Sequence, residues 1–195
     1  RVTGLTFEQS VLKRALDILV SVVALIVSSP IMLIEALAIK LEDGGPVFFK
    51  QPRVTKDGAI FQVLKFRTMI VDADKNKKRL ASQDDDRITK VGRIVRKLRI
   101  DELPQFINIL KGEMSVVGPR PEQAEITEKY VEVLPEFRYR LKVKAGLTGL
   151  AQILGKYNTT PKDKLILDLI YIEQYSIWVD LKLMLQTVKV LFKSD

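Results

Sequence analysis

Residues 90–121 read KVGRIVRKLRIDELPQFINILKGEMSVVGPRP, with two adjacent carboxylates between a basic segment and a proline-flanked arginine. Pro104 is tolerated only in the first turn of a helix, so a helix is predicted to begin near Asp101 and to end at residues 111–112. Unpaired backbone N–H groups at a helix start favour carboxylates or phosphates. Because neighbouring side chains on a helix diverge, Asp101 and Glu102 are expected to have different roles.

Both flanks of these carboxylates are suited to binding phosphate. Upstream, the apolar residues of segment 91–98 follow the spacing of one helix face and leave Arg96 among the cations on the other sides. Downstream, Pro119 and Pro121 fix the backbone around Arg120, whose guanidinium can bind a phosphate with little loss of entropy. Acidic caps, solvated basic faces and Pro-Arg-Pro turns are each more often structural. Their succession in one stretch favours phosphate chemistry.

The composition limits the classes of function. At 195 residues and 47% hydrophobic content the chain suits one domain with its own core. The net charge of +8 indicates an anionic partner, whether phospholipid, nucleotide, polyprenyl phosphate or nucleic acid. The chain has no Cys and no His, which excludes thiolate nucleophiles, imidazole bases, zinc fingers and disulfides. A metal would therefore have oxygen ligands, and Mg²⁺ is the natural candidate.

Residues 11–41 are the most apolar part of the chain, and residues 18–34 carry no charge. About 20 apolar residues cross a bilayer, but Ser29 and Pro30 predict a sharp bend, because Pro30 removes a helical hydrogen bond that a serine can replace. Cations flank both ends of the segment, which places both ends on the cytoplasmic side and predicts a re-entrant segment. The alternative is a buried core helix with a proline kink.

The remaining segments supply further candidates. Short strands are predicted at 47–50 and 60–66, and Lys65, near the end of the second strand, could contact a phosphate. The charged segment 72–86 is predicted to be a solvated connection rather than a metal site, because consecutive carboxylates do not easily converge on one ion.

The C-terminal third contains a second basic pattern and two helices. Cations alternate with apolar residues over 135–143, which predicts an extended strand with one basic face for lipid headgroups or a nucleotide diphosphate. A glycine-spaced loop at 146–155 lets backbone approach a ligand closely. Helices are predicted for 162–175 and from Trp178 onward, the last one lying at a membrane interface or packing in the core.

Several stretches together resemble one known family. Residues 85–122, DDRITKVGRIVRKLRIDELPQFINILKGEMSVVGPRPE, closely resemble the central signature of the bacterial sugar transferases, the monotopic polyprenyl-phosphate phosphoglycosyl transferases. The resemblance covers nearly the whole chain and departs from the family pattern at Thr55 and Ala145, where glycine and proline are usual. Further matches, in order, are KRALDILVSVVALIVSSPIMLIEALAIKLEDGGPVFFKQPRV, FQVLKFRTM, AGLTGLAQILGKYN and LDLIYIEQYS with a D-L-x-x-x-L-x-T-V tail.

This resemblance implies a mainly helical α+β fold forming a single domain over 1–195. A re-entrant membrane helix hairpin (11–41) would precede a small cytoplasmic catalytic part (42–195) with interfacial amphipathic helices. Since the first residue is Arg1, the chain is expected to be the catalytic part of a longer member. The implied location is the cytoplasmic face of the bacterial inner membrane.

The implied reaction transfers a sugar 1-phosphate from a UDP-sugar to polyprenyl (undecaprenyl) phosphate and releases UMP, as a first membrane step in polysaccharide or glycoconjugate synthesis. Asp101 would be the nucleophile of a covalent intermediate, and Glu102 would help bind Mg²⁺ with Asp101 or manage a proton. The residues expected to bind phosphate or substrate are Lys65, Arg67, Arg96, Arg120 and Gln152.

Two other classes stay open at this stage. A non-catalytic basic membrane scaffold would explain the apolar segment and the charge, and a nucleic-acid-binding domain would explain the charge alone. No nucleic acid is expected as a partner, whereas a homo-oligomer is allowed. The sugar, the pathway and the oligomeric state are not encoded in any single motif.

Overall fold

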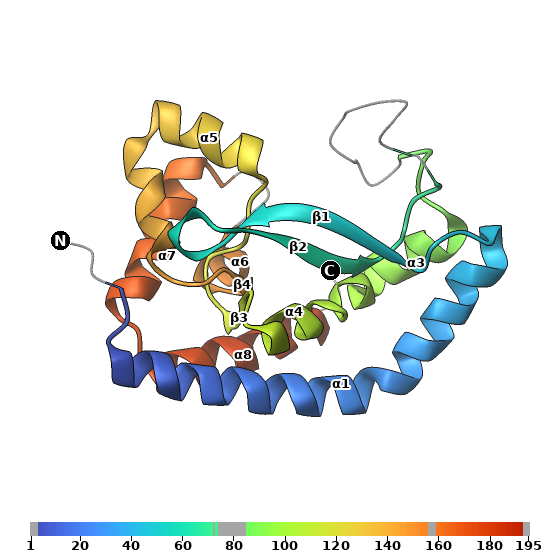
Figure 1. Cartoon of the computed structure of the whole chain (residues 1–195), viewed down its shortest axis with the longest axis horizontal. Coiled ribbons are helices and arrows are strands. Elements are labelled where there is room, and N and C mark those ends of the chain that lie inside the picture. The colour runs from blue at the N-terminus through green and yellow to red at the C-terminus, as the bar shows by residue number, and fades with distance from the viewer. Residues whose placement is uncertain (1–3, 72, 74–84, 156–158, 193–195) are drawn as a thin grey trace.

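The computed structural model describes residues 4–71, 73, 85–155 and 159–192. One long helix, α1 (Phe7–Asp43), runs along one side of the molecule, and the other elements lie together beside it (Figure 1). These elements are the strands β1 (Phe48–Val54), β2 (Ile60–Phe66), β3 (Ser115–Val117) and β4 (Gly146–Thr148); the helices α3 (Lys90–Leu98), α4 (Gln105–Lys111), α5 (Ala124–Val133), α6 (Leu150–Leu154), α7 (Pro161–Glu173) and α8 (Ile177–Phe192); and the 3-10 segments η1 (Lys56–Gly58), η2 (Ile100–Glu102) and η3 (Pro135–Lys142).

Helix α1 contains Pro30 and is bent (Figure 1). Pro30 has no N–H to donate to the carbonyl of Ile26, and the Ser29 hydroxyl donates to that carbonyl instead, at 2.8 Å. This is the compensation that the sequence predicts. The helix is continuous from Phe7 to Asp43 and does not fold back into two antiparallel arms. The structure therefore shows a bent rod and does not confirm the expected helix hairpin.

Most of the apolar surface of α1 is uncovered. The helix is long and apolar enough to cross a membrane, and only 17% of its most apolar 18-residue window is buried. Ile26, Val27 and Ile34 are each more than 60% exposed. A core helix of a soluble domain would bury these side chains, so the exposure argues against the core-helix alternative.

Three charged side chains in the first half of α1 face the rest of the protein. Lys13 forms an ion pair with Asp180 of α8 at 2.6 Å, and Asp17 accepts hydrogen bonds from the hydroxyl of Ser115 and the N–H of Val116, both at 2.9 Å. Lys13 and Asp17 are buried, and Arg14 donates to the carbonyls at the end of α4. The cations at this end are thus structural contacts rather than free headgroup ligands.

The far end of α1 is attached to the same body. Glu42 accepts a hydrogen bond of 2.8 Å from the backbone N–H of Lys90, at the start of α3, and Asp43 pairs with Arg67 just after β2. Carboxylates are favoured at a helix N-terminus, where backbone N–H groups lack helical partners. Both ends of the apolar helix are therefore fixed to the same body of strands and helices.

Two small sheets and three helices enclose the core. β1 and β2 form an antiparallel hairpin, and β3 pairs with β4 in parallel. Phe61 and Val63 of β2 pack with Ile109 of α4 and with side chains of β3, α7 and α8. The predicted hairpin, the helix over 91–98 and both C-terminal helices are confirmed, although β1 extends to Val54 instead of ending at Lys50.

Three local predictions are wrong or incomplete. Residues 135–142 form the 3-10 segment η3 rather than a strand, and Arg140 is buried rather than part of a basic face. The helix predicted from Asp101 is a 3-10 turn followed by α4 from Gln105. Most of the predicted solvated connection 72–86 lies outside the described residues, but Asp85 at its end is 2% exposed and pairs with Arg87 at 2.7 Å.

Candidate active site

The two carboxylates lie on the turn that joins α3 to α4. Arg99 ends α3 in a left-handed conformation (φ 56°), which reverses the chain into η2. A non-glycine residue in this region is uncommon and costs about 1–2 kcal/mol. Asp101 and Glu102 are thereby placed between two helices, on a short turn rather than inside a regular helix.

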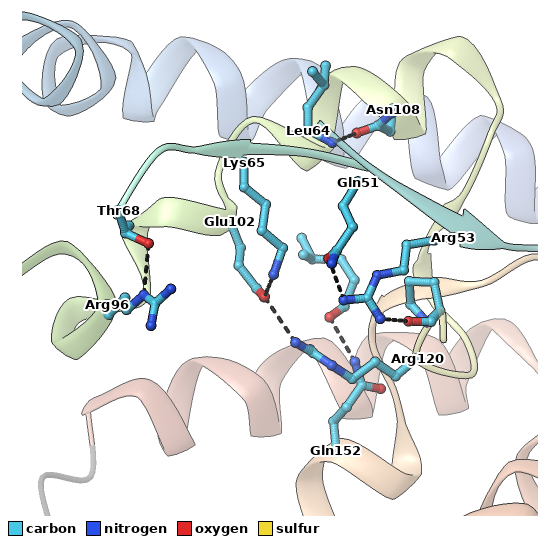
Figure 2. A network of polar contacts seen from close by, with 12 residues as sticks. Gln51, Arg53, Leu64, Lys65, Thr68, Arg96, Glu102, Asn108, Arg120 and Gln152 are labelled. Atoms are coloured by element: carbon cyan, nitrogen blue, oxygen red, sulfur yellow. Dashed lines mark hydrogen bonds and ion pairs between the residues drawn. The ribbon is translucent and has the colours of Figure 1, made fainter. Parts of the chain in front are cut away.

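Glu102 is held by two cations from different elements (Figure 2). Its Oε1 lies 2.7 Å from Lys65 Nζ of β2 and 3.0 Å from the guanidinium of Arg120, which follows β3. Burial alone would raise the pKa of Glu102, but Arg120 and Lys65 outweigh it and lower that pKa to about 2. Glu102 is therefore a stable anion at neutral pH.

Asp101 has a different environment from its neighbour. Among the residues that the structure describes, no side chain donates a hydrogen bond to Asp101. Burial and the adjacent Glu102 raise its pKa, and Lys65 and Arg96 only partly oppose them. Two adjacent carboxylates with opposite pKa shifts are suited to different chemical roles. A partly buried carboxylate without a donor is also a better nucleophile than a paired one.

The strand that carries Lys65 is held in place by hydrogen bonds to one side-chain amide. The buried Asn108 of α4 accepts a hydrogen bond from the N–H of Leu64 at 2.9 Å (Figure 2) and donates one of 2.8 Å to the carbonyl of Gln62. These two contacts fix the backbone of β2 on both sides of Val63, and Leu64 directly precedes Lys65. Sequence reasoning missed Asn108, which lies on the predicted helix without any signal of its partner.

Arg96 is brought near the carboxylates by close packing of α3. Its Nε donates to the hydroxyl of Thr68 at 2.8 Å (Figure 2). The helix approaches so closely that a Cβ on Gly92 would lie 2.1 Å from the carbonyl oxygen of Thr68. Only glycine fits at this contact without a shift of the backbone.

The other predicted residues are placed less directly. Arg67 points to the end of α1 and pairs with Asp43, so the structure does not bring it to the Glu102 cluster. Gln152 of α6 donates to the carbonyl of Leu147 at 2.9 Å, while its own carbonyl oxygen is buried without a partner among the described residues. Such an unsatisfied acceptor is available to a ligand.

Sequence reasoning missed two charged residues near the site. A small surface pocket is lined by Arg53 of β1 together with Lys65, Glu102 and Arg120, whereas Asp101 is not part of its lining. Glu35 of α1 is 4% exposed, both its oxygens lack a partner among the described residues, and it interacts electrostatically with Asp101. Its only sequence signal is an acidic group directly after the uncharged run of residues 18–34.

The site can also be tested for a fit to Mg²⁺. Within the described ranges, no cluster of three or more acidic side chains is placed to hold a metal ion. Mg²⁺ is usually bound through one or two carboxylates plus substrate phosphates. Asp101 and the second oxygen of Glu102 receive no side-chain donors in the described structure, so the two carboxylates fit that smaller donor set.

Comparison with known proteins gives the same family as the sequence motifs. The family model described as "Bacterial sugar transferase" matches residues 8–194. The chain is 42% identical over 181 residues to the UDP-N-acetylgalactosamine-undecaprenyl-phosphate N-acetylgalactosaminephosphotransferase of Aeromonas hydrophila, covering 91% of this chain and 43% of the relative. It is 43% identical over 188 residues to the UDP-glucose:undecaprenyl-phosphate glucose-1-phosphate transferase of Caulobacter vibrioides, covering 94% and 70%.

A third relative is named for yet another sugar. The galactosyl transferase CpsE of Streptococcus agalactiae is 42% identical over 196 residues, covering 94% of this chain and 43% of the relative. At nearly equal identity the three names refer to three sugars, so overall similarity does not select one. The chain spans about two fifths of the length of two of these relatives and 70% of the other. A match that covers residues 8–194 leaves no doubt about kinship: this chain belongs to the bacterial sugar transferase family.

Proposed function

We propose that the protein transfers a sugar 1-phosphate from a UDP-sugar to polyprenyl phosphate, most simply undecaprenyl phosphate, and releases UMP. The observation that carries the proposal is the contrast between Asp101, a partly buried carboxylate without a side-chain donor, and Glu102, an anion fixed by Lys65 and Arg120. Family membership and the names of the relatives support the same reaction.

The transfer takes place in two displacements on one phosphorus atom. The carboxylate of Asp101 attacks the phosphorus that bears the sugar, the bond from that phosphorus to the bridging oxygen breaks, and UMP leaves with both electrons. An oxygen of the polyprenyl phosphate then attacks the same phosphorus, and the Asp101 carboxylate departs. A carboxylate nucleophile suits a chain without Cys or His, and each displacement conserves charge and atoms.

Positive charge around the carboxylates provides most of the catalysis. Two phosphates meet in one site, so their repulsion and the charge that develops on the leaving oxygen must be neutralised. Arg120 is half exposed and Lys65 lines the same pocket, so both can contact a diphosphate while Glu102 holds them in place. Arg96 adds a third cation near Asp101. Removing one such donor typically costs about 10²–10³ in rate.

Mg²⁺ would be held by Asp101 and Glu102 and would neutralise charge on the substrate's phosphates. Glu102 is the residue suited to keep its negative charge for this purpose, because its pKa is about 2. Its contacts also keep Lys65 and Arg120 aligned before substrate binds.

Helix α1 would bring this site to the depth of the lipid phosphate. The uncovered apolar face favours insertion into the bilayer, while contacts at both ends hold the helix to one catalytic body. A helix that enters and leaves on the cytoplasmic face of the inner membrane satisfies both conditions. On α8, Trp178 is 79% exposed and Leu183 is buried, so this helix packs on the core with one side and can meet the membrane interface with the other.

The test is UMP release by protein purified in detergent, with UDP-glucose, UDP-galactose and UDP-N-acetylgalactosamine as donors. Without acceptor we expect about one UMP per active site and a phospho-sugar adduct in the intact mass, and with undecaprenyl phosphate many turnovers. Asp101→Asn should abolish both, whereas Asp57→Asn, at an exposed turn with φ 57°, should change neither. Glu102→Gln should be slow yet still accumulate the adduct.

The same assay separates the rival classes. Near-normal turnover by Asp101→Asn would refute the covalent mechanism. Absence of UMP release with every UDP-sugar would favour a non-catalytic scaffold, and salt-sensitive binding of DNA in detergent would favour a nucleic-acid-binding domain.

A further inference from the structure

The loop that carries Arg120 is fixed at three successive backbone carbonyls. The carbonyl of Pro119 accepts a hydrogen bond of 2.9 Å from the N–H of Gly146. The carbonyl of Arg120 accepts one of 2.9 Å from the guanidinium of Arg140, and that of Pro121 accepts one of 3.2 Å from Arg53. The prolines alone would limit only the backbone dihedral angles in this loop, whereas these bonds also set its position relative to β1, β4 and η3.

Arg140 is itself held from several sides. Its Nε and Nη2 lie 2.9 Å and 2.8 Å from Oδ2 of Asp168 on α7, and its guanidinium lies 4.7 Å from the centre of the Phe137 ring. Arg140 is 3% exposed and Asp168 is 2% exposed. The planar guanidinium bonds to the carboxylate and to the Arg120 carbonyl through nitrogens in a fixed fork, a geometry that the single nitrogen of a lysine ammonium does not reproduce.

We propose that Arg140, held by Asp168, is a positioning residue that sets where the Arg120 guanidinium meets a nucleotide diphosphate. Arg140 is too deeply buried to touch the substrate itself, and it acts through the backbone of Arg120. This inference rests on the proposed function, because it assigns Arg120 to the diphosphate of the donor.

A purely stabilising role would give a different pattern of effects. A buried ion pair is often no more stabilising than apolar side chains of the same volume, but apolar residues could not donate to the Arg120 carbonyl. If Arg140 acts through Arg120, its replacement should matter only while Arg120 is present. If it only stabilises the fold, its replacement should have the same effect with or without Arg120.

The experiment is a double-mutant cycle with Arg140→Lys and Arg120→Ala. Two quantities are measured, the UDP affinity by calorimetry and kcat for UMP release, with the melting temperature as a check on folding. A misplacement of about 1 Å can cost about 10²-fold, so we expect Arg140→Lys to reduce UDP affinity or kcat by about 10- to 10²-fold. In the Arg120→Ala background the same change should have less than about a twofold effect. Arg138→Lys, two residues away on an exposed position of the same segment, is the matched control.

The outcomes separate the inference from the proposed function. Equal effects of Arg140→Lys in both backgrounds would refute the positioning role. The protein could show the expected coupling between Arg140 and Arg120 in UDP affinity and yet never release UMP. That outcome would retain the inference and refute the proposed reaction. If Arg140→Lys does not fold, Asp168→Asn replaces it in the cycle, since an amide weakens the hold on Arg140 without removing its hydrogen-bond acceptor.

Discussion

Replacing Lys13 by methionine should lower the free energy of unfolding, because it leaves Asp180 as a buried carboxylate without its cation. Lys13 Nζ lies 2.6 Å from Asp180 and 3.1 Å from the hydroxyl of Tyr171, and the two charged side chains are only 6% and 2% exposed. Breaking a buried ion pair by removing one partner typically costs about 3–5 kcal/mol. Here the loss would release the first half of α1 from α8.

The pH dependence of the Lys13→Met variant follows from the remaining carboxyl. Burial raises the pKa of Asp180, and Lys13 opposes that shift, so the pKa rises further when Lys13 is lost. A carboxyl whose pKa is higher in the folded than in the unfolded state stabilises the fold at low pH and loses this contribution as pH rises. The variant should therefore recover part of its stability on acidification.

A double variant tests whether the loss of stability comes from the unpaired charge or from the changed shape of the side chain. Lys13→Met with Asp180→Leu replaces both ions by apolar groups, and Tyr171 can still donate to the carbonyl of Val117. Because such replacements are often neutral or stabilising, we expect the double variant to lie within about 1–2 kcal/mol of the parent. Lys182→Met, on an exposed site of α8, is the control.

Thermal unfolding in detergent measures these differences. At about 2–4 °C per kcal/mol for a domain of this size, the single variant should melt about 6–20 °C below the parent. A single variant with an unchanged melting temperature, or a double variant no more stable than the single one, would refute the claim that α1 is anchored through this pair.

Three further changes give predictions of different kinds. Glu102→Gln removes a charge that raises the Asp101 pKa, so the acidic limb of the pH–rate profile for UMP release should move to lower pH. Glu35→Leu removes a buried carboxyl without a partner, so the melting temperature in detergent should rise by an amount equivalent to about 1–3 kcal/mol. Gly92→Ala brings a Cβ against the Thr68 carbonyl, so stability should fall by about 1–3 kcal/mol and UMP release should slow.

Each of these predictions has an outcome that contradicts it. An acidic limb that stays in place in Glu102→Gln would mean that Asp101 does not control that limb. A lower melting temperature for Glu35→Leu would indicate a partner for this carboxyl that the described residues do not provide. Normal rate and stability in Gly92→Ala would show that α3 is free to move away from Thr68.

Local patterns in the sequence predicted those features of the structure that depend only on neighbouring residues. The bend at Pro30 and its compensation by Ser29 involve residues within one helical turn, and they follow from the chemistry of proline. The different surroundings of Asp101 and Glu102 likewise follow from their adjacency. The predicted roles of the other site residues come from the resemblance to a family, because residue spacing and periodicity do not indicate them.

The contacts that the sequence could not predict are ion pairs between residues far apart in the chain. Arg140 belongs to a basic alternation that is typical of a solvated face, yet it is buried because Asp168, on α7, provides the opposite charge. Arg67 pairs with Asp43 at the end of α1, a contact that its motif does not indicate, and its assignment to the substrate stays a prediction. A charge pattern shows which groups need partners and not where the fold places them.

The anchoring of α1 and the position of the two carboxylates are structurally connected. Glu42, near the end of α1, caps α3, and α3 carries Arg96 and leads directly into the turn with Asp101. The helix proposed to enter the membrane is thus connected to the proposed nucleophile through one short helix. Any movement of the far end of α1 relative to the catalytic body would displace that helix, so the depth of the membrane helix and the position of Asp101 cannot vary independently.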